Sequence, residues 1–215
     1  MPSVGARTTA SIVVFDCESD GLPTRVGVRN ELNFDGIVCT VACALVVPAR
    51  RVDGVWVLER DKETQHTYWI DVAPQFTGLL QLFDDADLIV GFNSLSFDLP
   101  LLYKHYKRQH DQYISHRLKS HDVFLRIRDA TGTWPKLDFL LRENGLASKT
   151  SSGDEAVKMW EQQRRNELEA YCAADVRLTL ELTTLPALTL NGRQIPAFIF
   201  STVAALSAVM LSATP

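Results

Sequence analysis

Apolar and β-branched residues occur in short runs between polar turns, a pattern typical of buried strands. Residues 11–15, Ser-Ile-Val-Val-Phe, form such a run and predict a strand that continues to Glu18. The other runs that predict strands lie at residues 37–47, 55–58, 67–70 and 88–90.

Apolar residues at helical spacing predict one helix from Phe76 to Phe83 and a second that begins near Phe97. A long third helix is expected over residues 164–182. Tyr171 and Asp175 lie four residues apart in it and therefore share one face.

Two carboxylates lie at the end of the first strand. Because side chains alternate along a strand, Asp16 and Glu18 are expected to point to the same face. Neighbouring carboxylates repel each other and raise each other's pKa, a cost that a bound cation removes. Oxygen ligands favour Mg²⁺ or Mn²⁺. Taken alone, the pair is equally well interpreted as two solvent-facing carboxylates at a strand end.

Two further acidic residues stand at unusual places. Asp98 follows a strand end and begins a helix, where an aspartate alone is better interpreted as complementing the helix dipole. Asp175 lies in an apolar stripe, and charged groups are rarely buried unless they are paired or bind a metal. Tyr171 alone would be interpreted as a core tyrosine that makes one hydrogen bond.

Together, three segments resemble the three exonuclease motifs of the DEDDy group of RNase H-like 3′→5′ exonucleases. They are Phe15-Asp16-Cys17-Glu18, Gly91-Phe92-Asn93 leading into Phe97-Asp98, and Tyr171-Cys172-Ala173-Ala174-Asp175. The resemblance covers about residues 11–185 and is greatest to the exonuclease domains of B-family DNA polymerases. Residues 120–124 resemble the strand after the second motif, and residues 136–141 the helix before the third.

The resemblance implies an α/β, RNase H-like fold with a mixed sheet of five to six strands. Three antiparallel strands would be followed by parallel strands that alternate with helices. It also implies that Asp16, Glu18, Asp98 and Asp175 hold two Mg²⁺ or Mn²⁺ ions and that Tyr171 orients the attacking water. The implied activity is hydrolysis of nucleic acid from its 3′ end to 5′-mononucleotides, with single-stranded DNA the favoured substrate.

The charge of the chain does not indicate nucleic-acid binding, because its 215 residues carry a formal net charge of −4. A basic tract with interleaved tyrosines over residues 103–128 is equally consistent with a strand-binding surface and with a solvated helix face. The residues expected to contact substrate are Asn93, Phe97, Lys149 and Lys158.

We expect an extension at residues 1–10, an exonuclease domain at 11–190 and an apolar C-terminal segment at 191–215. No charged residue occurs from Gln194 onward, so this segment is expected to pack on the domain or to contact a protein partner. A membrane anchor is the less favoured interpretation. The four cysteines form no paired CxxC motif, which fits a reducing intracellular compartment such as the cytoplasm or nucleus.

Two alternative functions remain at this point. One is an exonuclease of the same fold that acts on RNA, because nothing in the sequence reports whether the site admits a 2′-hydroxyl. The other is a non-catalytic RNase H-like module that binds nucleic acid or serves as a structural subunit. The presence of all four carboxylates and the tyrosine argues against the second.

Overall fold

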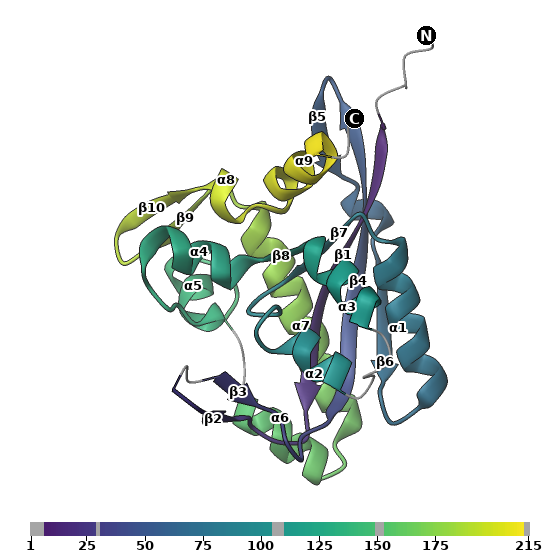
Figure 1. Ribbon diagram of the computed structural model, residues 1–215. Coiled ribbons are helices and arrows are strands. Elements are labelled where there is room, and N and C mark those ends of the chain that lie inside the picture. Colours follow the sequence, from purple (N-terminus) through teal and green to yellow (C-terminus); the bar gives the residue numbers. More distant parts are fainter. Residues whose placement is uncertain (1–6, 29–30, 105–109, 149–152, 213–215) are drawn as a thin grey trace.

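The computed structural model describes residues 7–28, 31–104, 110–148 and 153–212, and its centre is a six-stranded mixed sheet (Figure 1). The strands of this sheet are β1 (Thr9–Ser19), β4 (Cys39–Val52), β5 (Val55–Leu58), β6 (Thr64–Trp69), β7 (Leu88–Gly91) and β8 (Ser120–Asp122). A short 3₁₀ helix, Arg60–Lys62, lies between β5 and β6.

The pairing of the strands confirms the expected fold class. β1 pairs antiparallel with β4 along its whole length, whereas β7 and β8 continue the sheet in parallel. β4 is long enough to pair with β6 over its first half and with β5 over its second. The antiparallel part is therefore followed by parallel strands that are reached through helices, as in RNase H-like folds.

Helices cover both faces of the sheet (Figure 1). They are α1 (Ala73–Asp85), α2 (Asp98–Lys104), α3 (His110–Leu118), α4 (Val123–Thr131), α5 (Leu137–Glu143), α6 (Gly153–Glu161), α7 (Arg165–Thr184), α8 (Ala197–Phe200) and α9 (Thr202–Ser212). Two small hairpins complete the chain, β2 (Thr24–Val26) with β3 (Glu31–Asn33) and β9 (Ala187–Leu190) with β10 (Arg193–Pro196).

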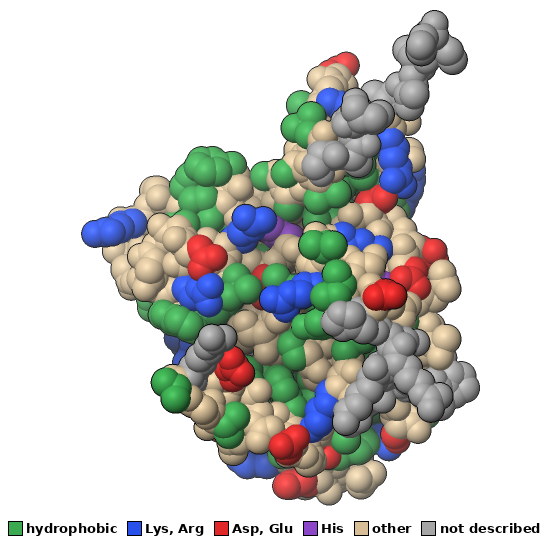
Figure 2. Space-filling view, viewed as in Figure 1, with side chains coloured by type: hydrophobic (Ala, Val, Ile, Leu, Met, Phe, Trp, Pro, Cys, Tyr) green, Lys and Arg blue, Asp and Glu red, His purple; other side chains and the backbone are tan. Residues whose placement is uncertain are grey.

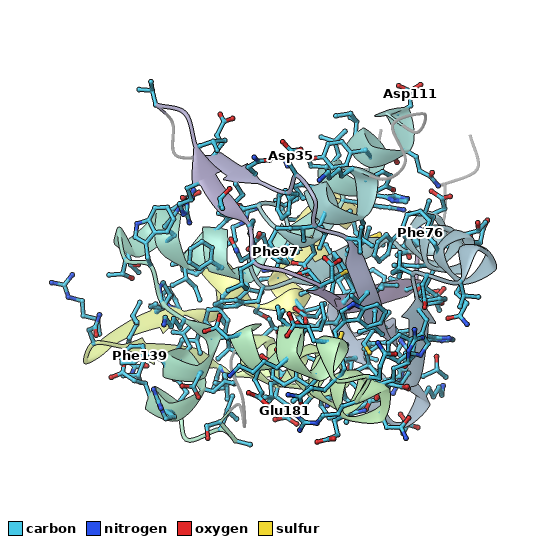
Figure 3. All side chains as sticks on the ribbon, turned by 90° about the horizontal axis from the view of Figure 1, so that it is seen from below. Asp35, Phe76, Phe97, Asp111, Phe139 and Glu181 are labelled. Atoms are coloured by element: carbon cyan, nitrogen blue, oxygen red, sulfur yellow. The ribbon has the colours of Figure 1, made fainter. Side chains whose placement is uncertain are left out.

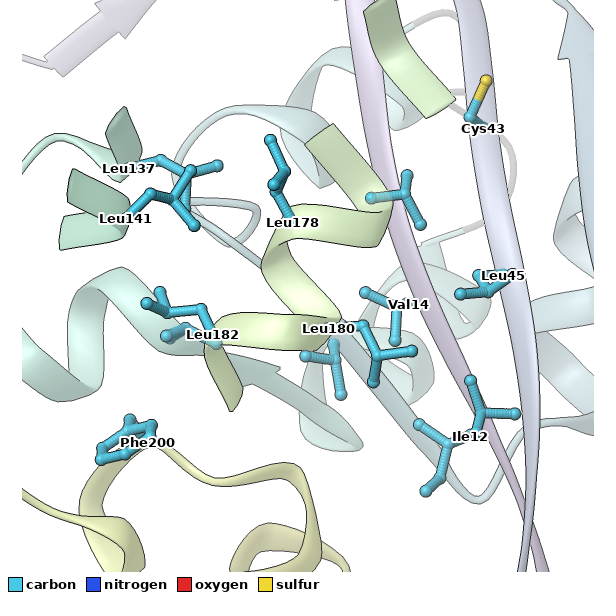
Figure 4. Close-up of a cluster of buried hydrophobic side chains, with 14 of the residues drawn as sticks. Ile12, Val14, Cys43, Leu45, Leu137, Leu141, Leu178, Leu180, Leu182 and Phe200 are labelled. Atoms are coloured by element: carbon cyan, nitrogen blue, oxygen red, sulfur yellow. The ribbon is translucent and has the colours of Figure 1, made fainter. Parts of the chain in front are cut away.

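The alternation of side chains along β1 separates two hydrophobic clusters. Ile12 and Val14 point to the face covered by α7, where they share a cluster with Leu178 and Leu180 (Figure 4). Val13, Phe15 and Cys17 of β1 point to the opposite face, which α1 and α2 cover. Because side chains alternate along a strand, Asp16 and Glu18 lie on the same face of the sheet as Ile12 and Val14.

The C-terminal elements pack on the α7 side of the sheet. Ile195, Phe200 and Leu206 are buried in the same cluster as Ile12, whereas Phe198 on α8 is exposed. Among the helices of the described residues, none combines the length and the apolar character that a membrane span requires.

The strand expected at residues 120–124 is shorter than predicted. β8 ends at Asp122, and α4 begins at Val123 because the Asp122 carboxylate accepts a hydrogen bond from the Leu125 backbone N–H (3.1 Å). An aspartate in this position caps a helix N-terminus.

Candidate active site

The two strand carboxylates lie on the α7 side of the sheet, near the carboxyl end of β1. Asp16 is half-buried and Glu18 is 8% exposed. Asp16 lies opposite Cys43 of β4, and Glu18 lies opposite Val41. Both carboxylates therefore extend the face that Ile12 and Val14 present to α7.

Asp98 lies at the edge of β1 that pairs with β7, opposite to the edge that pairs with β4. β7 pairs with β1 only over Ile12–Val14, so the backbone of β1 continues past the end of its parallel neighbour. There the backbone N–H of Cys17 donates to Asp98 Oδ1 (2.9 Å). The Asp98 side chain thus takes the place that a longer β7 would occupy, and it lies beside the segment that carries Asp16 and Glu18.

The loop between β7 and α2 sets the position of Asp98. Gly91 is required at its start, because a Cβ there would lie 2.6 Å from both Cβ and Oγ of Ser94. Asn93 has φ of +63°, a left-handed conformation that asparagine tolerates better than most residues. The Phe97 N–H then donates to the Asn93 carbonyl (3.0 Å), so the chain turns sharply into α2.

Asp122 holds this loop, a role that the sequence did not predict. Its carboxylate accepts the backbone N–H groups of Asn93 and Leu95, both at 2.9 Å, while it also caps α4. Burial raises the pKa of Asp122, and these backbone hydrogen bonds lower it in part. The sequence predicted a strand through this residue, and the loop residues that it binds lie 27 and 29 residues earlier in the chain.

α7 brings the third segment to β1. Tyr171 and Asp175 are both buried, at 7% and 3% exposed, and lie on one face of the helix. Between them, the Cys172 thiol donates to the Asp16 carbonyl (3.4 Å) and lies 3.9 Å from Asp16 Oδ2. The helix turn that carries Tyr171 and Asp175 is therefore packed directly on Asp16, the first carboxylate of the first segment.

Within the described residues, one cluster of three side chains has the spacing of a metal site. Ligand atoms of Asp16, Glu18 and Cys172 all lie within 4.8 Å of one another. Burial raises the pKa of the Cys172 thiol, and hydrogen bonding to Cys43 raises it further. Because thiolates rather than thiols bind metals, the carboxylates are the better ligands at neutral pH. An oxygen donor set of this kind fits Mg²⁺ or Mn²⁺.

The expected substrate contacts are only partly brought together. Asn93 and Phe97 lie on the loop that carries Asp98, and Phe97 is labelled in Figure 3. The Phe97 ring packs edge-on against Phe34, with 5.5 Å between ring centroids. Lys158 lies exposed on α6, where its ammonium is 3.5 Å from Glu155. Lys149 lies outside the described residues.

The described part of the basic tract is largely occupied by contacts within the fold. Lys104 donates to the Phe34 carbonyl, Lys119 to the carbonyls of Asp84 and Ala86, and Arg117 to the Leu95 carbonyl. These contacts favour the structural interpretation for those three side chains.

No family model and no curated protein sequence matches this chain. Among solved structures, it is similar to the family B DNA polymerase from the hyperthermophilic archaeon Pyrobaculum calidifontis, with a TM-score of 0.53 and 16% identity. The similarity covers 91% of this chain but 27% of the polymerase chain. At this identity the comparison shows the fold alone.

Proposed function

We propose that this protein is a metal-dependent 3′→5′ exonuclease of the DEDDy type. The observation that carries the proposal is the convergence of three distant segments on the carboxyl end of β1. Asp98 accepts the N–H of the residue between Asp16 and Glu18, and the helix that bears Tyr171 and Asp175 contacts Asp16 through Cys172.

The roles of the side chains follow from their chemistry. Asp16, Glu18, Asp98 and Asp175 would hold two Mg²⁺ or Mn²⁺ ions. When bound, such a pair of ions activates the attacking water and neutralises the departing 3′ oxygen. Phosphoryl transfer leaves a protein mainly the tasks of positioning and charge stabilisation. We assign the positioning of the water to Tyr171, which lies one helical turn before Asp175.

A 5′-labelled single-stranded DNA oligonucleotide tests the proposal. The full chain is incubated with it in Mg²⁺, in Mn²⁺ and in EDTA, beside the Asp16→Ala variant. We expect a ladder that shortens from the 3′ end with either metal, and no cleavage in EDTA or by the variant. The released product should be a 5′-mononucleotide. Circular dichroism and a melting curve show whether Asp16→Ala remains folded.

Matched RNA and duplex DNA substrates extend the same assay. Faster cleavage of RNA would support the exonuclease activity but show that RNA, rather than DNA, is the preferred substrate. Failure to cleave any substrate in either metal would overturn the proposal and favour a non-catalytic binding role.

A further inference from the structure

Three aromatic rings lie in series from the loop of the second segment to the surface. Phe92, directly after β7, packs against Phe124 of α4 with 5.7 Å between ring centroids. Phe124 packs in turn against Trp134, also at 5.7 Å. Two successive ring contacts therefore connect Trp134 to the loop that carries Asp98.

Trp134 differs from the other tryptophans in its exposure. It is 68% exposed, whereas Trp56 is 4% exposed and Trp69 and Trp160 are half-buried. The guanidinium of Arg128 lies 5.2 Å from the Trp134 ring centroid, in a cation–π arrangement. A large ring is thus packed against Phe124 and Arg128, with much of its surface open to solvent.

The surroundings of Trp134 are hollowed and carry more basic than acidic side chains, although Arg128 and Arg142 form ion pairs with Asp129 (2.6 Å) and Asp138 (3.0 Å). A cavity of about 430 Å³ adjoins it, and its lining includes Phe139, Lys136 and Arg142. Residues 126–142 contain four basic and two acidic side chains, in a chain whose net charge is −4. On the face shown in Figure 2, basic, hydrophobic and acidic side chains lie close together over the region of α4 and α5.

We propose that Trp134 is a stacking position for a base of single-stranded nucleic acid outside the catalytic centre. The inference rests on the proposed function, because it places a second contact on the strand whose 3′ end reaches Asp16. Bases in a single strand expose their faces, and an aromatic ring beside cations binds them with little sequence preference. In a duplex those faces are stacked on each other, so Trp134 should distinguish single strands from duplexes.

Binding is measured on the full chain in EDTA, so that cleavage does not interfere. The probe is a fluorescein-labelled oligothymidylate followed by fluorescence anisotropy, with a duplex of equal length alongside. We expect Trp134→Ala to weaken single-strand binding about 10-fold and duplex binding little. Trp134→Phe, which keeps a stacking face, should retain most of the affinity. Phe198→Ala removes another exposed aromatic ring and should change nothing.

Three results would overturn the inference. The first is unchanged affinity in Trp134→Ala, with or without a lower melting temperature, which would mean that Trp134 only covers Phe124. The second is an equal loss for duplex and single strand. The third is no binding by the wild-type chain. If Trp134→Ala binds single strands as well as the wild type and the wild type cleaves DNA, only the stacking inference is wrong. If binding depends on Trp134 but no substrate is cleaved in Mg²⁺ or Mn²⁺, only the proposed nuclease activity is wrong.

Discussion

Tyr171 is the residue whose proposed role is separable from metal binding. Its ring is buried against the α7 side of the sheet, and phenylalanine would fill the same space. We expect Tyr171→Phe to slow cleavage on the order of 100-fold, because a misplaced nucleophile costs about that much. Affinity for Mn²⁺, measured by calorimetry, should stay at the wild-type value. Cleavage at the wild-type rate would remove Tyr171 from the mechanism, and lost Mn²⁺ binding would give it a structural role.

A buried histidine predicts how stability depends on pH. The His116 ring is fully buried, with Nε2 2.7 Å from Asp84 Oδ1 and Nδ1 against the Tyr103 hydroxyl. Burial lowers the pKa of His116, although Asp84 opposes the shift. The unfolded chain, in which a histidine has a pKa of about 6.5, then binds the proton more readily than the folded chain. Acidification below that pH therefore favours unfolding.

Urea unfolding at pH 7.5 and at pH 5.5 measures this effect. The wild-type protein should be less stable at the lower pH, and the difference should shrink in His116→Gln, which cannot titrate. An equal pH dependence in both proteins would show that other groups control the acid response. His121, whose pKa burial also lowers, is expected to account for part of the remainder.

At the scale of elements, the β7–α2 loop leaves no room for a side chain at Gly91. Gly91→Ala would place a methyl group 2.6 Å from Ser94 Cβ and 3.4 Å from the Phe15 carbonyl oxygen. We expect this overpacking to cost about 1–3 kcal/mol of stability and to lower cleavage, since the loop carries Asp98. The free energy of unfolding and the cleavage rate are measured together.

A second substitution isolates the cause. Ser94→Gly removes the atoms that the new methyl group would meet, so Gly91→Ala combined with Ser94→Gly should recover part of both losses. Ser94→Gly alone is the control for added backbone freedom. If the double variant is no better than Gly91→Ala, the clash with Ser94 does not explain the defect.

The sequence predicted those elements whose apolar pattern is local. The run at residues 11–15 and the helix expected over residues 164–182 correspond to β1 and α7. The β4–β5 and β9–β10 hairpins were not predicted as hairpins, although Asp53-Gly54 and Asn191-Gly192 are typical turn pairs and all four residues have positive φ. Both turn pairs are local signals that indicate a hairpin from the sequence alone.

The residues of the proposed site stand out in the sequence, whereas the contacts that support them do not. Asp16 and Glu18 stand out because carboxylates follow an apolar strand. Cys172 contacts Asp16, which lies 156 residues earlier in the chain, and Asp122 binds Asn93, which lies 29 residues earlier. A local sequence pattern cannot predict contacts over such separations. The same holds for the Arg128 and Trp134 pair, which looks like ordinary surface composition until the fold brings the two together.

On the scale of the whole molecule, the C-terminal segment is packed into the main core. Phe200 is fully buried in the cluster that contains Ile12 and Leu180 (Figure 4). Nε2 of the His121 ring lies 2.9 Å from the Phe200 carbonyl oxygen. We expect Phe200→Ala to cost about 3–5 kcal/mol of stability. Phe198→Ala, only two residues earlier and 76% exposed, should stay within about 0.5 kcal/mol of wild type. Urea unfolding of both variants measures the contrast, and equal losses would contradict the packing described here.

The central claim is that three segments of this chain build one site for two metal ions. Anomalous diffraction from crystals of the full chain grown with Mn²⁺ tests it most directly. We predict two anomalous peaks about 3.5–4 Å apart at the carboxyl end of β1, within ligand distance of Asp16, Glu18, Asp98 and Asp175. No anomalous peak at this end of the sheet at saturating Mn²⁺, or Mn²⁺ bound only elsewhere, would contradict the account.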